Sequence, residues 1–583
     1  MTDDTQNASQ GASVSLALVG SGGAGVMTSG NMMLEAATKA GLYGLMTRTV
    51  GPQIRGGEAA ALLRLASQPV HNVNDIFDIL VAVDWKGAER FAAEVPLGPD
   101  SLIITDPAAG DVPEILAATG ARIVEVPLAE LAASVEGGRE NMVILGLVAG
   151  LIGLTEDPIY KIIDKKLKKK GEAAVTASRA TVHAGFRAAE DVTSPVKLAP
   201  AEEEGKDRWL ISGNQATGFG ALRGGIRFVA AYPITPATEV LEWMSPNLPK
   251  VGGTLVQAED ELASINMAIG ASFGGRPSLT ATSGPGLSLM MEGIGLAVAS
   301  ETPVMVVNVM RGGPSTGIPT KSEQTDLNIA VYGLHGDAPH IVTAPTSVED
   351  CVFTAQWTVH LTEAMQTVSI LLSDQFMGQA SAVIDPPANI SFMAQRLVEN
   401  EPTEEYRRYA VTASGISPMA LPGTPGGQYT ADGLEHNPKG LPSTMMEDHR
   451  DQLDKRDRKV AGFDYGDHWA DIDGDEDSEL VVLTWGSTTN AVREGINRLR
   501  AEGIRCKLVA MRLLSPAVPK LFDAALQGAK RILVVEQSHS QQFYKLLRAN
   551  YDMPGETRSF HRAGPLIIRP GEIVDTLKSW RVQ

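Results

Sequence analysis

The hydrophobic residues of this chain fall into short runs of the kind that buried strands form, each followed by a stretch with helical spacing. In the first third of the chain, Val14–Val19 is such a run, and Val26–Ala40 has the spacing of a helix. Strands that alternate with helices indicate a mainly parallel sheet covered by helices. We therefore predict one α/β domain over residues 1–190. Its further strands are expected at 79–83, 102–105 and 122–126.

The same alternation returns twice along the chain. Residues 191–208 contain proline, alanine and charged residues with little to bury, which predicts an exposed linker. A second α/β domain is predicted at 209–387 and a third at 476–583. Between them, residues 388–475 are expected to form an excursion over the surface or into a subunit contact, with a Gly- and Pro-rich tract and a charged helix at 445–459. The fold class is thus α/β, with three domains whose sheets are mainly parallel. The strands predicted for the second and third domains are 228–231, 278–281, 304–309, 368–372, 480–485, 506–510 and 532–536.

Composition narrows the classes of function. The net charge of −19 and the pI near 5.1 argue against nucleic acid or an acidic membrane as a general partner. The two cysteines, Cys351 and Cys506, lie far apart, which excludes a self-contained zinc or iron–sulfur site. Residues 1–13 lack the features of a secretory signal, and no apolar run could span a bilayer of about 30 Å, so we expect a cytoplasmic protein without a membrane partner. The basic run Lys161–Lys170 is interpreted as a solvated helix face.

Two glycine-rich motifs stand in the first domain. The first, GSGGAG at Gly20–Gly25, follows a strand and opens a helix, where backbone N–H groups can approach a phosphate. A dinucleotide site would also need a carboxylate about 20 residues onward, but that region offers only Arg48 and Arg55. A structural turn or an anion contact is therefore preferred over a dinucleotide. The second motif, GPQIRGGEAA at 51–60, holds Arg55 between glycines and suits a phosphate or a carboxylate, with a bland turn as the alternative.

Two stretches of the middle domain carry candidate chemistry. In AAYPITPATE, at 230–239, two prolines follow a strand and place Thr235 at the carboxyl edge of the sheet, where we expect it to be rigid and exposed. In QAEDELASINMAIGAS, at 257–272, a predicted helix opens with three carboxylates. Such a cluster is often only compensation of the helix dipole, worth about 0.3 to 1 kcal/mol, and these residues alone favour that alternative. The carboxylates are Glu259, Asp260 and Glu261, and the apolar face expected after them is Leu262, Ile265 and Ile269.

Two further loops shift that balance. TSGPG, at 282–286, follows another strand, and VVNVMRGGPSTGIPT, at 306–320, places Arg311 just before a glycine-rich loop. All four loops follow strands of the same predicted sheet, so they are expected to converge at one edge. A threonine, a carboxylate, a glycine-lined backbone and an arginine suit an anionic substrate beside an organic cofactor.

With YPITP, EDELA, TSGPG and MRGGPSTG in that order, the middle domain resembles the pyrimidine-binding domain of 2-oxoacid:ferredoxin oxidoreductases. GSGGAG and GPQIRGG resemble the gamma unit of that family, here ahead of the alpha unit, and 476–583 resembles its transketolase C-terminal-type domain. The arrangement is most similar to the two-subunit 2-oxoglutarate synthases. The resemblance implies an alpha subunit that uses thiamine diphosphate and coenzyme A to convert 2-oxoglutarate into succinyl-CoA and CO₂, or the reverse. Pyruvate and branched-chain or aryl 2-oxoacids are alternative substrates.

The resemblance also assigns roles to residues. Glu261, or alternatively Glu259, would contact N1′ of the thiamine pyrimidine, where a carboxylate favours the imino tautomer that removes the thiazolium proton. Arg311 would pair with the substrate carboxylate beside Thr235, unless it is a structural partner of Glu261 or Asp326. A second substrate carboxylate would need another cation, Lys321 or Arg276. The cofactor contacts implied are Tyr232, Pro233, Ile234, Glu261, Ser283 and Gly284, and those of coenzyme A are Arg55, Gly56 and Gly57.

One absence points to partners. Thiamine diphosphate enzymes hold the diphosphate through Mg²⁺, usually with Gly-Asp-Gly and a later asparagine. The sequence has no Gly-Asp-Gly, and the acidic stretches at 335–337 and 473–477 lack the following pattern. We therefore expect no metal on this chain, and expect the ligands of Mg²⁺, the diphosphate and the cluster on a separate beta subunit. The resemblance implies that the cluster is [4Fe-4S], that ferredoxin is the electron partner and that the assembly is an (αβ)₂ heterotetramer. A dinucleotide-dependent dehydrogenase and a non-catalytic binding subunit are the alternative classes.

Overall fold

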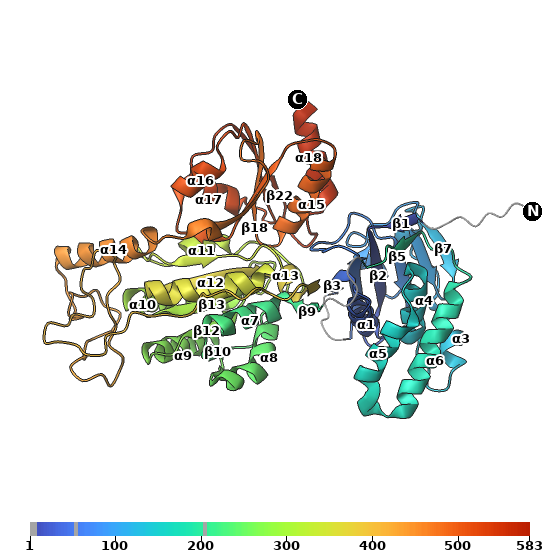
Figure 1. Ribbon diagram of the computed structural model, residues 1–583, viewed down its shortest axis with the longest axis horizontal. Coiled ribbons are helices and arrows are strands. Elements are labelled where there is room, and N and C mark those ends of the chain that lie inside the picture. The colour runs from blue at the N-terminus through green and yellow to red at the C-terminus, as the bar shows by residue number, and fades with distance from the viewer. Residues whose placement is uncertain (1–8, 52–55, 202–206, 583) are drawn as a thin grey trace, which may run out of the picture. The chain divides into compact units, whose positions relative to one another are not determined.

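The computed structural model describes residues 9–51, 56–201 and 207–582. They form two compact units: Met1–Ser212 with Gln379–Pro386, and Gly213–Gly378 with Pro387–Gln583 (Figure 1). The predicted α/β fold class is confirmed, since helices alternate with strands in both units. No helix of the described residues is long and apolar enough to cross a membrane.

The first unit is built on an eight-stranded sheet with the order β7-β6-β5-β2-β4-β3-β16-β9. Its first four strands are parallel, as predicted. The other four strands pair antiparallel with their neighbours. Consecutive strands β3 and β4 form a hairpin that we did not predict, and β16 pairs with both β3 and β9. The last two strands come from the region predicted as the middle domain. The strands are β2 (Ser13–Ser21), β3 (Tyr43–Val50), β4 (Glu58–Ala66), β5 (Ile79–Ala82), β6 (Leu102–Thr105), β7 (Arg122–Glu125), β9 (Trp209–Ser212) and β16 (Ser381–Ile384); β1 (Ser9–Gly11) and β8 (Val196–Leu198) pair separately.

A nearly all-apolar helix, α4, forms the centre of the helical layer of this unit. Eleven of its residues are buried because α1, α3 and α6 all pack against it. Gly146 of α4 and Gly185 of α6 make the α4–α6 crossing close, since a Cβ at either position would overlap the backbone of the other helix. The helices are α1 (Val26–Lys39), α2 (Glu114–Ala117), α3 (Leu128–Ala133), α4 (Glu140–Ile152), α5 (Glu156–Leu167) and α6 (Glu172–Ala189).

The second unit contains a seven-stranded sheet with the order β11-β10-β12-β13-β15-β14-β20, in which only β20 is antiparallel. Both faces are covered: Met305, Val307 and Val309 of β13 pack with α7 and α8, and Val306 and Met310 pack with α9 and α10. This fully buried strand is apolar on both faces for this reason, with Asn308 as its single polar residue. The elements are α7 (Gly213–Gly224), β10 (Phe228–Ala231), α8 (Thr238–Asn247), β11 (Thr254–Gln257), α9 (Glu261–Phe273), β12 (Ser278–Thr282), α10 (Gly284–Ala299), β13 (Val304–Met310), α11 (Leu327–Tyr332), β14 (Ile341–Thr343), α12 (Asp350–Met365), β15 (Val368–Asp374), α13 (Gln375–Gln379) and β20 (Leu513–Ser515).

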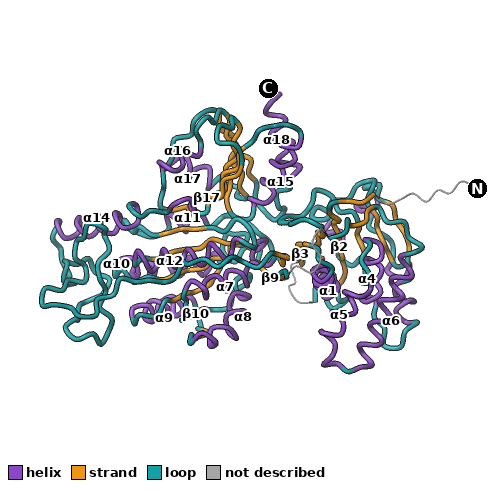
Figure 2. The backbone as a smooth tube through the Cα atoms, viewed as in Figure 1, coloured by secondary structure: helices purple, strands orange, loops and turns teal. Residues whose placement is uncertain are grey.

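A long connection then leads to α14 (Met446–Ala461). Residues 385–445, all of which the structure describes, contain no helix or strand and are drawn as loop in Figure 2. The connection is not loosely attached, because Arg396 forms a buried ion pair with Glu363 of α12. Two lysines of α14, Lys455 and Lys459, reach a buried glutamate, Glu301, after α10.

The chain ends with a five-stranded sheet of order β17-β19-β18-β21-β22. Residues of its strands and of β15 belong to one continuous hydrophobic core, so 213–378 and 387–583 form a single compact unit. The domain division at residue 476 therefore stays a prediction from sequence. The elements are β17 (Ala470–Asp473), β18 (Leu480–Trp485), α15 (Thr488–Ala501), β19 (Lys507–Met511), α16 (Pro519–Ala525), β21 (Arg531–Glu536), α17 (Gln542–Asn550), β22 (Glu556–His561) and α18 (Pro570–Val582).

Candidate active site

Four loops meet at the carboxyl edge of the middle sheet. Strands β11, β10, β12 and β13 are neighbours in that order, and every pair is parallel. Parallel strands end at the same edge, so the loops that follow them lie side by side. These loops contain Thr235, Glu261, Ser283 and Arg311.

Of the three carboxylates around the start of α9, only Glu261 is buried. It is the first residue of the helix and is 7% exposed, whereas Glu259 and Asp260 lie on the surface. Asp260 caps the helix by accepting a hydrogen bond from the N–H of Ala263 at 2.7 Å. The predicted helix start at Glu259 was therefore two residues early. Leu262 is 52% exposed, so the buried face consists of Ile265 and Ile269 without it.

The Glu261 carboxylate lies against Gly286 in the first turn of α10. A Cβ built on Gly286 would be 2.8 Å from Oε1 of Glu261 and would overlap Oγ1 of Thr282. Glycine is required here by close approach, since its φ angle is not positive. No described residue donates a hydrogen bond to the Glu261 carboxylate. A carboxylate that no protein group donates to marks a place where a ligand can donate.

Arg311 is tied to the loop of Thr235. Its Nη1 donates to the backbone carbonyl of Thr235 at 2.6 Å, while Nε is buried without a partner. Among the described residues, no carboxylate lies within ion-pair distance of this guanidinium, and the side chain is 7% exposed. Burial lowers the pKa of Arg311, and the charge of Asp326 acts in the opposite direction. Thr235 itself is half-buried, so our expectation that it would be exposed was wrong.

Asp326 and Asn308 complete this edge. Nδ2 of Asn308 donates to Oδ2 of Asp326 at 2.9 Å, and both carboxylate oxygens lie 2.8 Å from where a Cβ on Gly284 would stand. Burial raises the pKa of Asp326, against the hydrogen bond from Asn308 and the charge of Arg311. We did not predict Asn308 from the sequence. It is the only polar residue in the strand VMVVNVM, and because burying an unpaired polar group is costly, a lone polar residue in such a run indicates a specific partner.

Some of the other predicted site residues lie at this edge of the sheet, and Arg276 does not. Lys321 lies at the base of the loop after Arg311, because its carbonyl accepts from the N–H of Gly312 at 2.9 Å. Arg276 precedes β12 and so stands at the opposite edge of the sheet, away from the site. Ser283 is fully buried with an unpartnered Oγ. Tyr232 is 40% exposed, and Pro233 and Ile234 are half-buried.

The first unit has its own cavity, of about 810 Å³, at the GSGGAG turn. Gly25 adopts φ +87° and caps α1 without a side chain, so the N–H groups of the first turn of α1 have no side-chain acceptor. Asn141, 8% exposed and without a side-chain hydrogen bond among the described residues, packs against Gly25. Three cations, Arg139, Lys166 and Lys170, line the same cavity.

The two glycine motifs of this unit touch. A Cβ on Gly22 would lie 2.7 Å from the Cα of Gly56 and 2.8 Å from the carbonyl oxygen of Gly57. Asp84, which we did not predict, fixes the turn by accepting hydrogen bonds from the N–H and Oγ of Ser21 at 2.9 and 2.8 Å. Arg55 lies outside the described residues.

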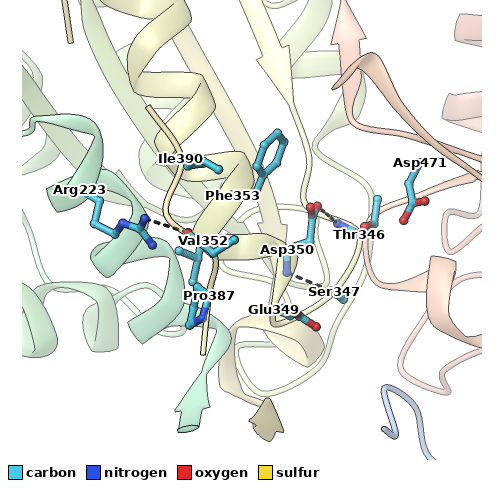
Figure 3. A pocket seen from close by; sticks show the side chains of 11 residues that line it. Arg223, Thr346, Ser347, Glu349, Asp350, Val352, Phe353, Pro387, Ile390 and Asp471 are labelled. Atoms are coloured by element: carbon cyan, nitrogen blue, oxygen red, sulfur yellow. Dashed lines mark hydrogen bonds between the residues drawn. The ribbon is translucent and has the colours of Figure 1, made fainter. Parts of the chain in front are cut away.

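A separate cavity of about 300 Å³ lies at the start of α12 and shares no residue with the Glu261 site (Figure 3). Its polar groups are already paired: Arg223 donates to the carbonyl of Ala388 at 2.9 Å, and Oδ2 of Asp350 accepts from the N–H of Thr346 at 2.8 Å. Asp350 also forms an ion pair with Arg512. The carboxylate of Asp350 and the guanidinium of Arg223 are therefore already engaged within the protein.

Known proteins match all three parts of the chain. Residues 15–188 match the family described as pyruvate ferredoxin/flavodoxin oxidoreductase, 219–455 its thiamine diphosphate-binding domain, and 468–542 the transketolase C-terminal domain. The 2-oxoacid:ferredoxin oxidoreductase subunit alpha of Saccharolobus solfataricus is 32% identical over 72% of this chain and 68% of the relative. The chain belongs to the 2-oxoacid:ferredoxin oxidoreductase family. The predicted resemblance is thereby confirmed.

Other members of the family sharpen the comparison. The 2-oxoglutarate synthase subunit KorA of Methanothermobacter marburgensis is 32% identical over 64% of this chain and 98% of the relative. The solved 2-oxoglutarate:ferredoxin oxidoreductase of Magnetococcus marinus, with 2-oxoglutarate, coenzyme A and succinyl-CoA bound, is 35% identical with a TM-score of 0.90 and covers 98% of this chain and 100% of its own. In this 2-oxoacid:ferredoxin oxidoreductase chain, residues 219–455, which contain Glu261 and Arg311, are the part that matches the thiamine diphosphate-binding model.

Proposed function

We propose that this chain is the alpha subunit of an enzyme that decarboxylates 2-oxoglutarate oxidatively, transfers the succinyl group to coenzyme A and passes two electrons to ferredoxin, or runs this reaction in reverse. The observation that carries the proposal is Glu261, a residue only 7% exposed whose carboxylate lies against Gly286 and has no donor among the described residues. Family membership supports the class of reaction. Relatives named for 2-oxoglutarate support the choice of substrate.

The residues around Glu261 fit the pyrimidine of thiamine diphosphate. The carboxylate has no donor among the described residues, so it is able to accept a hydrogen bond from a ring nitrogen. Glycine at 286 leaves the space beside it free, and burial strengthens a charge-assisted hydrogen bond there. Bound thiamine diphosphate supplies the nucleophilic carbon and the electron sink that decarboxylation requires. Tyr232, Pro233, Ile234, Ser283 and Gly284 are the further cofactor contacts that we propose.

The substrate would lie between Thr235 and Arg311. One arm of the guanidinium is held by the Thr235 carbonyl, so the remaining N–H groups are oriented for a carboxylate. Lys321, at the base of the same loop, is the cation proposed for the distal carboxylate of 2-oxoglutarate. Arg276 is not proposed, because it stands at the other end of β12.

Coenzyme A is proposed to occupy the cavity of the first unit. A free helix N-terminus, a glycine turn and three cations suit its phosphates. Gly56 and Gly57 join this site through their contact with Gly22. Arg55 remains a proposed phosphate ligand from the sequence motif alone.

A beta subunit is proposed to supply Mg²⁺, the diphosphate site and a [4Fe-4S] cluster. The chain has only two cysteines, and no group of three potential metal ligands forms among the described residues. A single cluster needs four cysteine ligands in most iron–sulfur proteins. We therefore propose an (αβ)₂ assembly that reduces ferredoxin in the cytoplasm.

The proposal is tested by purifying the chain with its beta subunit and measuring ferredoxin reduction with coenzyme A and a panel of 2-oxoacids. We expect 2-oxoglutarate to give the highest kcat/KM. Lys321→Met should lower kcat/KM for 2-oxoglutarate and leave that for pyruvate nearly unchanged, because pyruvate lacks the distal carboxylate. A complex without bound thiamine diphosphate, or one that prefers pyruvate, would contradict the proposed cofactor or substrate respectively.

The role of Glu261 has a matched control in its neighbour. Glu261→Gln should lower kcat by about 10² to 10⁴, the usual range for removing a group that drives proton transfer. Asp260→Asn removes a charge one residue away but keeps a good helix cap, so it should retain full turnover. Equal activity of the two variants would exclude Glu261 from the chemistry.

A further inference from the structure

The segment 322–328 joins the loop of Arg311 to α11 and lies against the C-terminal part of the chain. Its central residue, Gln324, is 1% exposed. The N–H of Gln324 donates to the carbonyl of Gln537 at 2.9 Å, and Oε1 of Gln324 accepts from the N–H of Gln537 at 2.8 Å. Its Nε2 donates to the carbonyl of Trp485 at 2.9 Å. Both ends of the side-chain amide are therefore bound to backbone of the C-terminal sheet.

Two more glutamines hold the same segment from the other side. Nε2 of Gln537, directly after β21, donates to the carbonyl of Ser322 at 3.2 Å. Gln542, at the start of α17, donates to the carbonyl of Thr325 at 2.9 Å and accepts from the N–H of Asn328 at 2.9 Å. The segment is thus attached to the C-terminal part at each end and in the middle.

What this attachment fixes is the base of the loop that carries the proposed substrate cations. The carbonyl of Lys321, next to Ser322, accepts from the N–H of Gly312, which is next to Arg311. On the other side, Asp326 follows Gln324 by two residues, and its charge acts on Arg311. In sequence, Gln324 therefore lies between the base of the loop at Lys321 and Asp326, whose charge acts on Arg311.

We propose that Gln324 is a positioning residue, through which the C-terminal part of the chain holds Arg311 and Lys321 in the geometry that binds the 2-oxoacid. The proposal rests on the function proposed above for the same site. A cation that is already in place binds a carboxylate without paying for ordering of its loop at each binding event. The side-chain amide suits this task, because it donates and accepts at once, which neither glutamate nor methionine does.

The test uses the assembled enzyme with Gln324→Met, which keeps the volume and removes both amide hydrogen bonds. We expect KM for 2-oxoglutarate to rise about tenfold with kcat within about twofold, since carboxylate binding is shared by ground and transition states. Gln324→Glu keeps the acceptor for Gln537 but sets a charge against the carbonyl of Trp485. It should change KM in the same direction and serves if the methionine variant does not fold.

The matched control is Gln356→Met. Gln356 is also 1% exposed, and its Nε2 donates to the carbonyls of Ile390 and Phe392 at 3.1 and 2.8 Å, away from the substrate loop. Gln356→Met should lose about as much unfolding free energy as Gln324→Met and leave KM unchanged. Equal KM changes in the two variants would reduce Gln324 to a structural role.

A second measurement does not depend on turnover. Amide hydrogen exchange at Gly312 and Ile318, whose N–H groups are bonded within the loop, should quicken in Gln324→Met and not in Gln356→Met. Unchanged exchange overturns the positioning role whatever the activity. If the wild-type complex turns over no 2-oxoacid, the proposed function fails. Faster exchange in Gln324→Met would then still show that Gln324 anchors the loop, but the role of Gln324 in 2-oxoacid binding would be overturned.

Discussion

Nη1 of Arg311 donates a hydrogen bond to the backbone carbonyl of Thr235 at 2.6 Å, so one residue of the proposed substrate site holds another. Lysine at 311 would keep the positive charge but lose the planar fork that binds the carbonyl and a carboxylate together. We expect Arg311→Lys to lower kcat/KM for 2-oxoacids about 10- to 100-fold. Arg223→Lys, which weakens a surface contact with Ala388, should match the wild type. Steady-state kinetics of the two variants test this prediction. Unchanged kcat/KM in Arg311→Lys would show that Arg311 does not bind the substrate.

Gly286 gives a prediction with an internal control on the same helix. Alanine at 286 would push its Cβ against Oε1 of Glu261 and Oγ1 of Thr282, so we expect a loss of about 1 to 3 kcal/mol in unfolding free energy and loss of thiamine diphosphate binding. Gly295 of α10 has nothing within 4 Å of an added Cβ, and Gly295→Ala should stabilise the helix by up to about 1 kcal/mol. Urea unfolding and cofactor titration measure both effects. A stabilised, cofactor-binding Gly286→Ala variant would contradict the close approach.

The order of motifs along the chain was enough to predict that the four loops meet at one edge of the sheet, because parallel strands bring their carboxyl ends to that edge whatever the details of the loops. Thr235 and Arg311 each follow a strand that the apolar runs located, whereas β11, the strand before Glu261, was not among the predicted strands. The inward turn of Glu261 was not predictable from three adjacent carboxylates, since only the exact helix start decides which one faces the core. A difference of two residues in that start separates a surface charge from a buried one.

The pairing of strands that lie far apart in the sequence was not predicted. The addition of β9 and β16 to the first sheet depends on partners up to several hundred residues away, which periodicity within a window does not report. Gln324 illustrates the same limit. Its partners, Gln537 and Trp485, are more than 150 residues distant in sequence, and an isolated glutamine in a loop carries no pattern.

The buried ion cluster on α14 gives a third prediction. Glu301 accepts from Nζ of Lys455 at 2.5 Å and from Nζ of Lys459 at 2.8 Å, and all three side chains are at most 1% exposed. Glu301→Gln would remove the counter-charge of the two buried lysines, which we expect to cost about 3 to 5 kcal/mol. Glu479→Gln, in an exposed pair with Lys530, should change stability little. Chemical denaturation tests the contrast, and a small effect at Glu301 would mean that the lysines are already neutral.

Lys455 should make stability depend on pH. Burial and the charges of Lys459 and Arg408 lower the pKa of Lys455 to about 7, against Glu301, which raises it. Its ordinary value in the unfolded chain is 10.5, so between these two pH values the unfolded state binds more protons, and raising the pH through this window favours the folded state. Other groups titrate in this pH range as well. Lys455→Met removes only the contribution of Lys455 and keeps the pair between Glu301 and Lys459. We expect the free energy of unfolding, measured at pH 7 and 9, to rise more in the wild type than in Lys455→Met. An equal rise in both proteins would mean that Lys455 keeps its proton in the fold, so that the cluster holds its full positive charge.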